Sequence, residues 1–208
     1  MGAAAAPLPN DRAIPPERLP VDPAGHRATG AWGTALLIAT EASLFAYLLF
    51  SYCYLASMSR GAFYSHYGPP ELTLAGPNTV VLAASSATMW WAESGVRRGK
   101  TGRLRLGLAL TFVLGAVFLA VQLREYAKLP FRPQSDAYAS LFWTITGFHG
   151  AHVLVGLLAV AVVLVRALLG HFGAGRHLAV TNVSWYWHFV DVVWLAVFTS
   201  LYLSPRFA

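Results

Sequence analysis

The chain has few charged residues and almost no cysteine for its length of 208 residues. Asp, Glu, Lys and Arg make up 12% of the sequence, about half the fraction typical of a soluble domain. The single cysteine, Cys53, excludes a disulfide within one chain and any metal cluster built on several thiolates. Runs of about 20 residues that carry few charges are typical of an integral membrane protein.

The first 28 residues lack the basic start and the apolar core of a cleavable signal peptide. They are rich in Pro and Ala, so we expect a poorly ordered or surface-lying tail over residues 1–28. The net charge of +6 invites a nucleic-acid interpretation. The basic residues lie in short segments between apolar runs, however, so we expect no nucleic-acid partner.

Five apolar stretches predict an all-α membrane domain, a bundle of five transmembrane helices, over residues 29–208. The stretches run over about residues 31–54, 77–93, 104–123, 138–165 and 181–203. The fourth would reach about 42 Å at 1.5 Å per residue, so it should tilt or protrude. With the N-terminus inside, the inner segments hold ten Lys and Arg residues and the outer segments five. The positive-inside rule therefore predicts an inside N-terminus and an outside C-terminus.

Polar side chains inside these stretches are costly in a bilayer and usually face protein. Glu41, near the centre of the first stretch, is either a proton-handling carboxylate or a hydrogen-bonded group that fixes helix packing. His149 and His152 lie three residues apart, as do His188 and Asp191, so each pair shares a helix face. His188 and Asp191 could pair with each other or with the two histidines of the fourth stretch.

Histidines at this spacing could also ligate a metal or a haem iron. A di-iron carboxylate site would need several Glu residues, including Glu-x-x-His pairs, which the sequence lacks. We therefore expect no metal or cofactor site in this chain. Arg166 and His171, just beyond the fourth stretch, suit lipid head-group phosphates. Glu125, at the end of the third stretch, is expected to be solvated.

Four motifs together resemble subunit III of the haem–copper oxidases, the cytochrome c oxidase subunit III family. They are WYWHFVDVVWL at 185–195, TGFHGAHVLVG at 146–156, QLREY at 122–126 and PNTVVLAASS at 77–86. The carboxylate in TEASLFAYLLFSY at 40–52 fits the same pattern. The resemblance covers residues 31–203 and implies a membrane subunit without redox centres. Such a subunit packs against the catalytic subunit I, which holds the haems and the copper, and against other oxidase subunits.

The same resemblance implies roles for single residues. Glu41 matches the family's buried carboxylate, and the family supports proton uptake and protects the complex during turnover. The other matching motif positions are His149, His152, Trp187, His188 and Asp191. The family also binds phospholipid, and Arg166 and His171 fall where it contacts head groups; Trp187 is a third lipid-binding candidate. No residue of this chain is expected to be catalytic.

The sequence departs from the family pattern in two ways that bear on the kind of oxidase to which it would belong. Mitochondrial-type members have seven helices rather than five. The family also often has a carboxylate about four residues before the WYWH motif, where this chain has Thr181. Five helices are familiar in bacterial oxidases, which implies a subunit of a cytochrome c oxidase in a bacterial cytoplasmic membrane. A quinol oxidase or a nitric oxide reductase cluster is the alternative. From other classes, an independent proton or ion transporter and a small b-type cytochrome remain open, although no internal symmetry supports the transporter.

Overall fold

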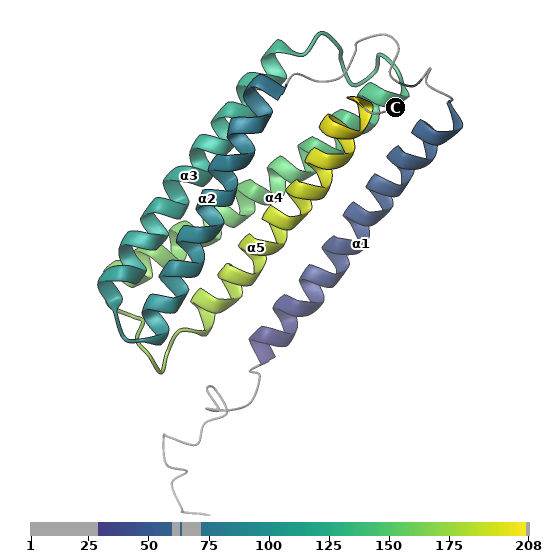
Figure 1. Ribbon diagram of the computed structural model, residues 1–208. Coiled ribbons are helices and arrows are strands. Elements are labelled where there is room, and N and C mark those ends of the chain that lie inside the picture. Colours follow the sequence, from purple (N-terminus) through teal and green to yellow (C-terminus); the bar gives the residue numbers. More distant parts are fainter. Residues whose placement is uncertain (1–28, 60–62, 64–71, 207–208) are drawn as a thin grey trace, which may run out of the picture.

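Five long helices and a short helical C-terminal end make up the computed structural model, which describes residues 29–59, 63 and 72–206 (Figure 1). The tail predicted over residues 1–28 lies outside this range. The prediction of an all-α bundle of five helices is confirmed. The helices are α1 (Thr29–Met58), α2 (Leu72–Arg97), α3 (Thr101–Lys128), α4 (Ala137–Leu168) and α5 (Leu178–Phe198). A π-helical turn, η3 (Thr199–Leu203), and a 3₁₀ turn, η4 (Ser204–Arg206), follow α5.

α1, α2, α3 and α4 are longer than the apolar stretches that predict them, because polar residues continue these helices past the hydrocarbon region, and α5 begins three residues before its stretch and passes into the π-helical turn η3. Within the described ranges, α1, α3, α4 and α5 are long and apolar enough to cross a bilayer. α2 does not meet this apolar criterion, and it buries Asn78, Ser85 and Glu93. Its 26 residues span about 39 Å at 1.5 Å per residue, which also suffices to cross.

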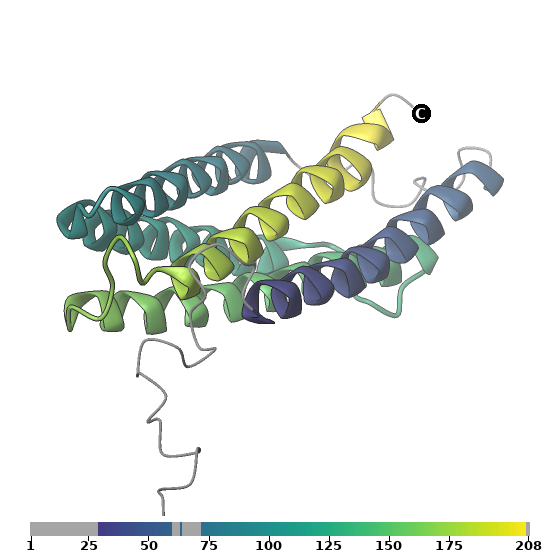
Figure 2. The same ribbon diagram turned by 90° about the horizontal axis from the view of Figure 1, so that it is seen from below.

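α2 and α3 form a tight antiparallel hairpin on one side of the bundle (Figure 1). Gly99, with φ +70°, closes the turn between them, and Gly107 of α3 lies against Ala92 of α2. A Cβ at Gly107 would lie 2.7 Å from the Ala92 Cβ, so only glycine allows this approach. α1 lies at the opposite edge, where it packs on α5 and α4 (Figures 1 and 2).

Trp187 of α5 lies in the centre of the bundle. Its ring fills a notch between Gly115 of α3 and Gly156 of α4, whose added Cβ atoms would lie 2.6 and 3.0 Å from the indole. Its Nε1 donates a hydrogen bond of 3.0 Å to Ser85 Oγ of α2. Trp187 is only 1% exposed, so lipid cannot reach it. The prediction that Trp187 contacts lipid is therefore wrong, and its indole is the side chain on which four helices converge.

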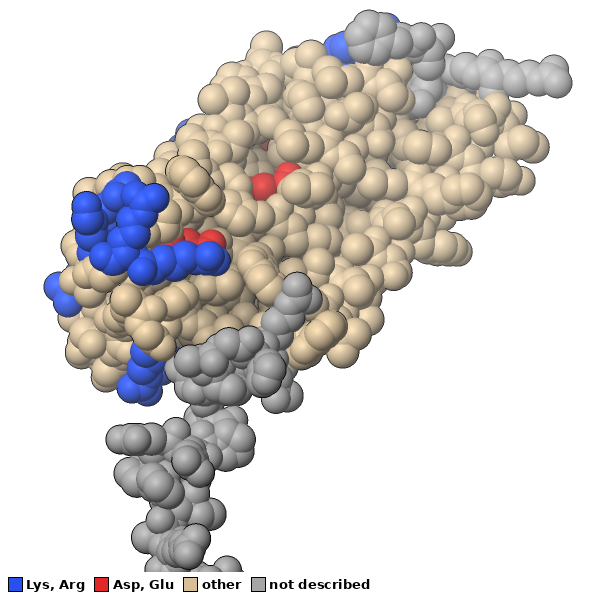
Figure 3. All heavy atoms as spheres, turned by 60° about the horizontal axis from the view of Figure 1, so that its bottom comes forward, with Lys and Arg blue, Asp and Glu red and all other residues tan. Residues whose placement is uncertain are grey.

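Lys and Arg side chains gather at the end of the bundle that carries the α2–α3 turn (Figure 3). The α4–α5 connection lies at the same end and adds Arg176, while Arg166 belongs to the last turn of α4. These are the segments that the positive-inside rule places inside. The orientation of the termini stays a prediction.

Candidate functional site

Glu41 of α1 and His152 of α4 form a polar pair between the two helices. His152 Nε2 lies 3.0 Å from Glu41 Oε2, and its Nδ1 lies 2.7 Å from the carbonyl oxygen of Phe148. Because a carbonyl only accepts, Nδ1 carries a proton. Two bare acceptors at 3.0 Å would repel each other, so a proton also lies between Nε2 and Oε2. The pair therefore shares one proton, either as neutral imidazole with a carboxylic acid or as imidazolium with a carboxylate.

The surroundings of this pair come from three helices. The Phe45 ring, one turn beyond Glu41, meets the His152 ring edge-on with centroids 5.1 Å apart. Tyr186 of α5 donates from its hydroxyl to the His152 carbonyl at 3.3 Å. The side chains of Glu41 and His152 keep 27% and 16% of their surface exposed. The proton-sharing pair is therefore held by α1, α4 and α5, yet can be reached from the membrane face.

His149 lies one turn before His152 but in a different environment. It is completely buried, with its ring centroid 4.8 Å from that of Trp194 and 5.9 Å from that of Phe118. Neither ring nitrogen has a hydrogen-bond partner among the residues that the structure describes. His149 thus packs as an aromatic ring, and this tight enclosure does not fit a haem ligand.

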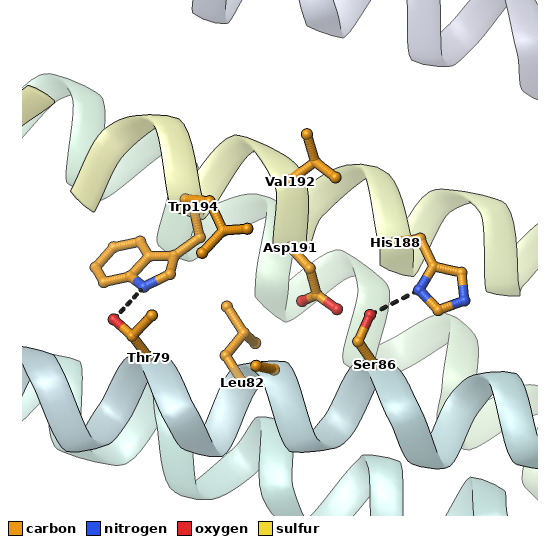
Figure 4. A pocket seen from close by; sticks show the side chains of 9 residues that line it. Thr79, Leu82, Ser86, His188, Asp191, Val192 and Trp194 are labelled. Carbon is orange, nitrogen blue, oxygen red and sulfur yellow. Dashed lines mark hydrogen bonds between the residues drawn. The ribbon is translucent and has the colours of Figure 1, made fainter. Parts of the chain in front are cut away.

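α2 and α5 line a groove of about 190 Å³ on the side of the bundle (Figure 4). At one end Ser86 Oγ lies 2.7 Å from His188 Nδ1, and at the other Trp194 Nε1 donates to Thr79 Oγ1 at 2.9 Å. The Asp191 carboxylate points into the groove between these two contacts (Figure 4). His188 and Asp191 thus share a groove, as their spacing predicts.

The pairings considered for His188 and Asp191 are replaced by other contacts. His188 bonds to Ser86 rather than to Asp191, and His152 bonds to Glu41. No hydrogen bond joins Asp191 to either histidine of α4 in the described part of the chain. The physical reason is that α2, which lies against α5, offers hydroxyl groups that the sequence pattern did not single out.

Glu93 is a buried carboxylate that the sequence interpretation missed. It is 7% exposed, accepts a hydrogen bond from Ser184 of α5 at 2.7 Å, and pairs with Arg97 at 2.5 Å. Its position at the expected end of the second stretch hid this role. The spacing of four residues between Glu93 and Arg97, which favours an ion pair on one helix face, is the signal that could have revealed it.

A second buried carboxylate lies at the other end of the bundle. Glu125 is 6% exposed, so the expectation that it is solvated is wrong. α3 continues beyond it to Lys128, and the π-helical turn η3 brings the buried Tyr202 beside its carboxyl group. Gln122, one turn earlier on α3, is buried as well. These residues form a polar layer that closes the bundle.

Arg166 and His171 lie at the basic end, where α4 finishes. Both are exposed, and the Arg166 guanidinium lies 5.4 Å from the centre of the Phe172 ring. Their accessibility suits a lipid phosphate, and this role stays a prediction. Across the described ranges, no three His, Cys, Asp or Glu side chains converge as ligands of a metal ion.

Fold and site together define a polytopic α-helical membrane protein whose buried polar residues pair between helices. The family model described as cytochrome c oxidase subunit III matches residues 26–205. The chain therefore belongs to the cytochrome c oxidase subunit III family.

Individual relatives agree with this assignment. Cytochrome c oxidase subunit 3 of Papio hamadryas is 33% identical over 189 residues, which cover 86% of this chain and 72% of that protein. The Danio rerio protein of the same name is 44% identical over 125 residues, 60% of this chain and 48% of that protein. The protein from Spodoptera frugiperda is 38% identical over 125 residues, 60% of this chain and 85% of that protein. The match with the fish protein thus spans about half of that protein's length.

Proposed function

We propose that this chain is subunit III of an aerobic terminal oxidase in a bacterial cytoplasmic membrane. It packs against the catalytic subunit I and further subunits, which hold the haems and the copper, and it carries no redox centre itself. The observation that carries the proposal is the family match over residues 26–205. Relatives whose names specify cytochrome c oxidase favour cytochrome c over quinol as the electron donor.

The Glu41–His152 pair supports a role in proton uptake. One proton lies between Oε2 and Nε2 at a separation of 3.0 Å, and both side chains stay partly exposed, so a polar group of a partner subunit packed on this face would exchange that proton with the pair. A purely structural hydrogen bond would not need an ionisable group on each side. The pair would thus hold protons close to the catalytic subunit and keep their supply steady during turnover.

Lipid binding is proposed for Arg166 and His171 only. Both side chains are exposed at the basic end, where anionic head groups would lie under the proposed orientation. Trp187 is left out because it is buried.

Purification of the tagged chain under mild detergent tests the proposal. We expect partner subunits to co-purify, identified by mass spectrometry, together with the haem absorbance of an oxidase. A chain that purifies without a haem-containing partner would contradict the proposed function. Proton conduction by the isolated chain in liposomes would instead support a transporter, and quinol-driven oxygen consumption would assign the complex to the quinol branch.

A further inference from the structure

Tyr186 of α5 grips the turn of α4 that carries His152. Its hydroxyl donates to the His152 carbonyl oxygen at 3.3 Å, and its ring lies against Gly156, four residues further along α4. A Cβ at Gly156 would lie 3.4 Å from the Tyr186 ring, so the ring packs directly on this part of the helix. Tyr186 is 9% exposed. One buried side chain of α5 therefore contacts both ends of a single turn of α4.

The Glu41–His152 pair tolerates little displacement of this turn. His152 Nε2 lies 3.0 Å from Glu41 Oε2. N–H···O hydrogen bonds measure about 2.7–3.2 Å, so a further separation of about half an ångström would break this one. The direction of the imidazole ring is set within α4, because its Nδ1 donates to the Phe148 carbonyl. The position of the α4 backbone relative to α1 must therefore be set by contacts outside the pair.

α5 packs on both helices that supply the pair. It contacts α1, which lies at the edge of the bundle, and it contacts α4. Asn182 of α5 donates to the Gly30 carbonyl of α1 at 3.3 Å, as Tyr186 donates to α4. Asn182 and Tyr186 are four residues apart and share a face of α5. Consecutive turns of one helix thus bond to the two helices between which the proton is shared.

Tyr186 also lies near the Glu41 half of the pair. The charge of the Glu41 carboxylate acts on the Tyr186 phenol, which places the phenol within electrostatic range of that group. The hydroxyl gives its hydrogen to the His152 carbonyl, so it leaves the proton between Glu41 and His152 untouched. This arrangement suits a group that holds the pair in place, rather than a third carrier of the proton.

We propose that Tyr186 is a positioning residue of the Glu41–His152 pair, whose hydroxyl keeps the α4 turn at the separation from α1 at which the two side chains share one proton. The inference rests on the proposed function, because proton uptake is assigned there to this pair. Phenylalanine at position 186 would keep the ring against Gly156 and would lose only the bond to the carbonyl. The contribution of the hydroxyl can therefore be measured by itself.

The Tyr186→Phe variant of the assembled oxidase complex in vesicles tests the proposal. Infrared difference spectra between two pH values record the vibrations of the Glu41 carboxyl group, identified as the bands that Glu41→Gln removes. We expect Tyr186→Phe to shift or broaden these bands and to slow proton uptake about two- to tenfold, the effect of one hydrogen bond. Tyr47→Phe is the matched control, since Tyr47 of α1 is 71% exposed, and it should change neither the bands nor the rate.

A double substitution separates positioning of the pair from a role elsewhere in the chain. If Tyr186 acts through the pair, Tyr186→Phe should slow proton uptake no further in a complex that already carries Glu41→Gln. Equal slowing in both backgrounds would overturn the inference, as would unchanged Glu41 bands in the single variant. Loss of the subunit from the Tyr186→Phe complex, counted by mass spectrometry, would make the hydroxyl an assembly contact and would overturn it too.

Failure of the proposed function gives a different result. Proton uptake that Glu41→Gln leaves unchanged would refute the role of the pair in uptake, and the infrared bands would still decide whether Tyr186 positions the pair. Uptake that is slowed by Glu41→Gln but not by Tyr186→Phe would refute only the positioning role.

Discussion

Replacing Glu41 by glutamine should separate proton handling from packing at the α1–α4 contact. The glutamine amide matches the carboxyl group in size and can donate an N–H to His152 Nε2 across the present 3.0 Å. The hydrogen bond between the helices is thus kept, but its proton can no longer be released. We expect the oxidase complex to assemble with this subunit at full occupancy, while proton uptake slows and activity is lost sooner during turnover.

The size of the packing effect follows from the geometry of the pair. One hydrogen bond contributes about 1 kcal/mol net, so a variant that keeps the bond should change stability by less than about 1 kcal/mol. Glu41→Leu removes the partner of His152 Nε2 and should be less stable by about 1–3 kcal/mol. Because α1 lies at the edge of the bundle, where it packs on α5 and α4, this loss should loosen α1 first.

Three measurements on reconstituted vesicles distinguish the two roles. Quantitative mass spectrometry gives subunit occupancy, a pH-sensitive dye gives the rate of proton uptake, and oxygen consumption gives the number of turnovers before inactivation. Ser43→Ala is the matched control, since its hydroxyl donates to the Ala39 carbonyl of the same helix. If a fully assembled Glu41→Gln complex takes up protons at an unchanged rate and completes as many turnovers before inactivation, the Glu41 carboxylate serves helix packing alone. Loss of the subunit from that complex would refute the argument that glutamine keeps the hydrogen bond between α1 and α4.

Two further predictions concern packing and lipid. Gly115→Ala should destabilise the bundle by about 1–3 kcal/mol, because its Cβ would lie 2.6 Å from the Trp187 ring, while Gly102→Ala on the same helix meets no atom within 4 Å and should be neutral or stabilising. Detergent-induced unfolding followed by circular dichroism measures the stability of both variants. Equal stability would refute the close packing of Trp187 on Gly115. Arg166→Ala should lower the phospholipid retained after purification, measured by lipid mass spectrometry, more than the control Arg176→Ala, and equal losses would contradict a specific head-group contact.

The sequence predicts helices well in this chain and side-chain partners poorly. Long apolar runs determine which segments cross the membrane, and all five predicted stretches are helical. Glu125 shows the limit at helix ends: the apolar run stops before it, but α3 and the turn carrying Tyr202 continue and bury it. Burial of a polar residue near a helix end depends on a segment distant in sequence, which local composition does not contain.

His149 and His152 show the limit at helix faces. A spacing of three residues leaves two side chains about 60° apart around the helix axis. That offset turns His149 into the aromatic core beside Trp194 and turns His152 towards Glu41 on α1. Periodicity predicts that the two histidines lie near each other, and it cannot predict which neighbouring helix each one meets.

The contacts of α5 with α2 explain how the polar residues of the groove between these helices come together. Lipid tails are as apolar as leucine, so interhelical hydrogen bonds and close packing, rather than burial from water, set the helix register. Four such bonds join the two helices, made by Ser184, Trp187, His188 and Trp194 of α5 with Glu93, Ser85, Ser86 and Thr79 of α2. At about 0.6 kcal/mol each they supply roughly 2 kcal/mol, enough to fix the register of α2 against α5. In that register each of these four side chains meets a partner within the chain, and the Asp191 carboxylate lies beside Ser86 in the groove between α2 and α5.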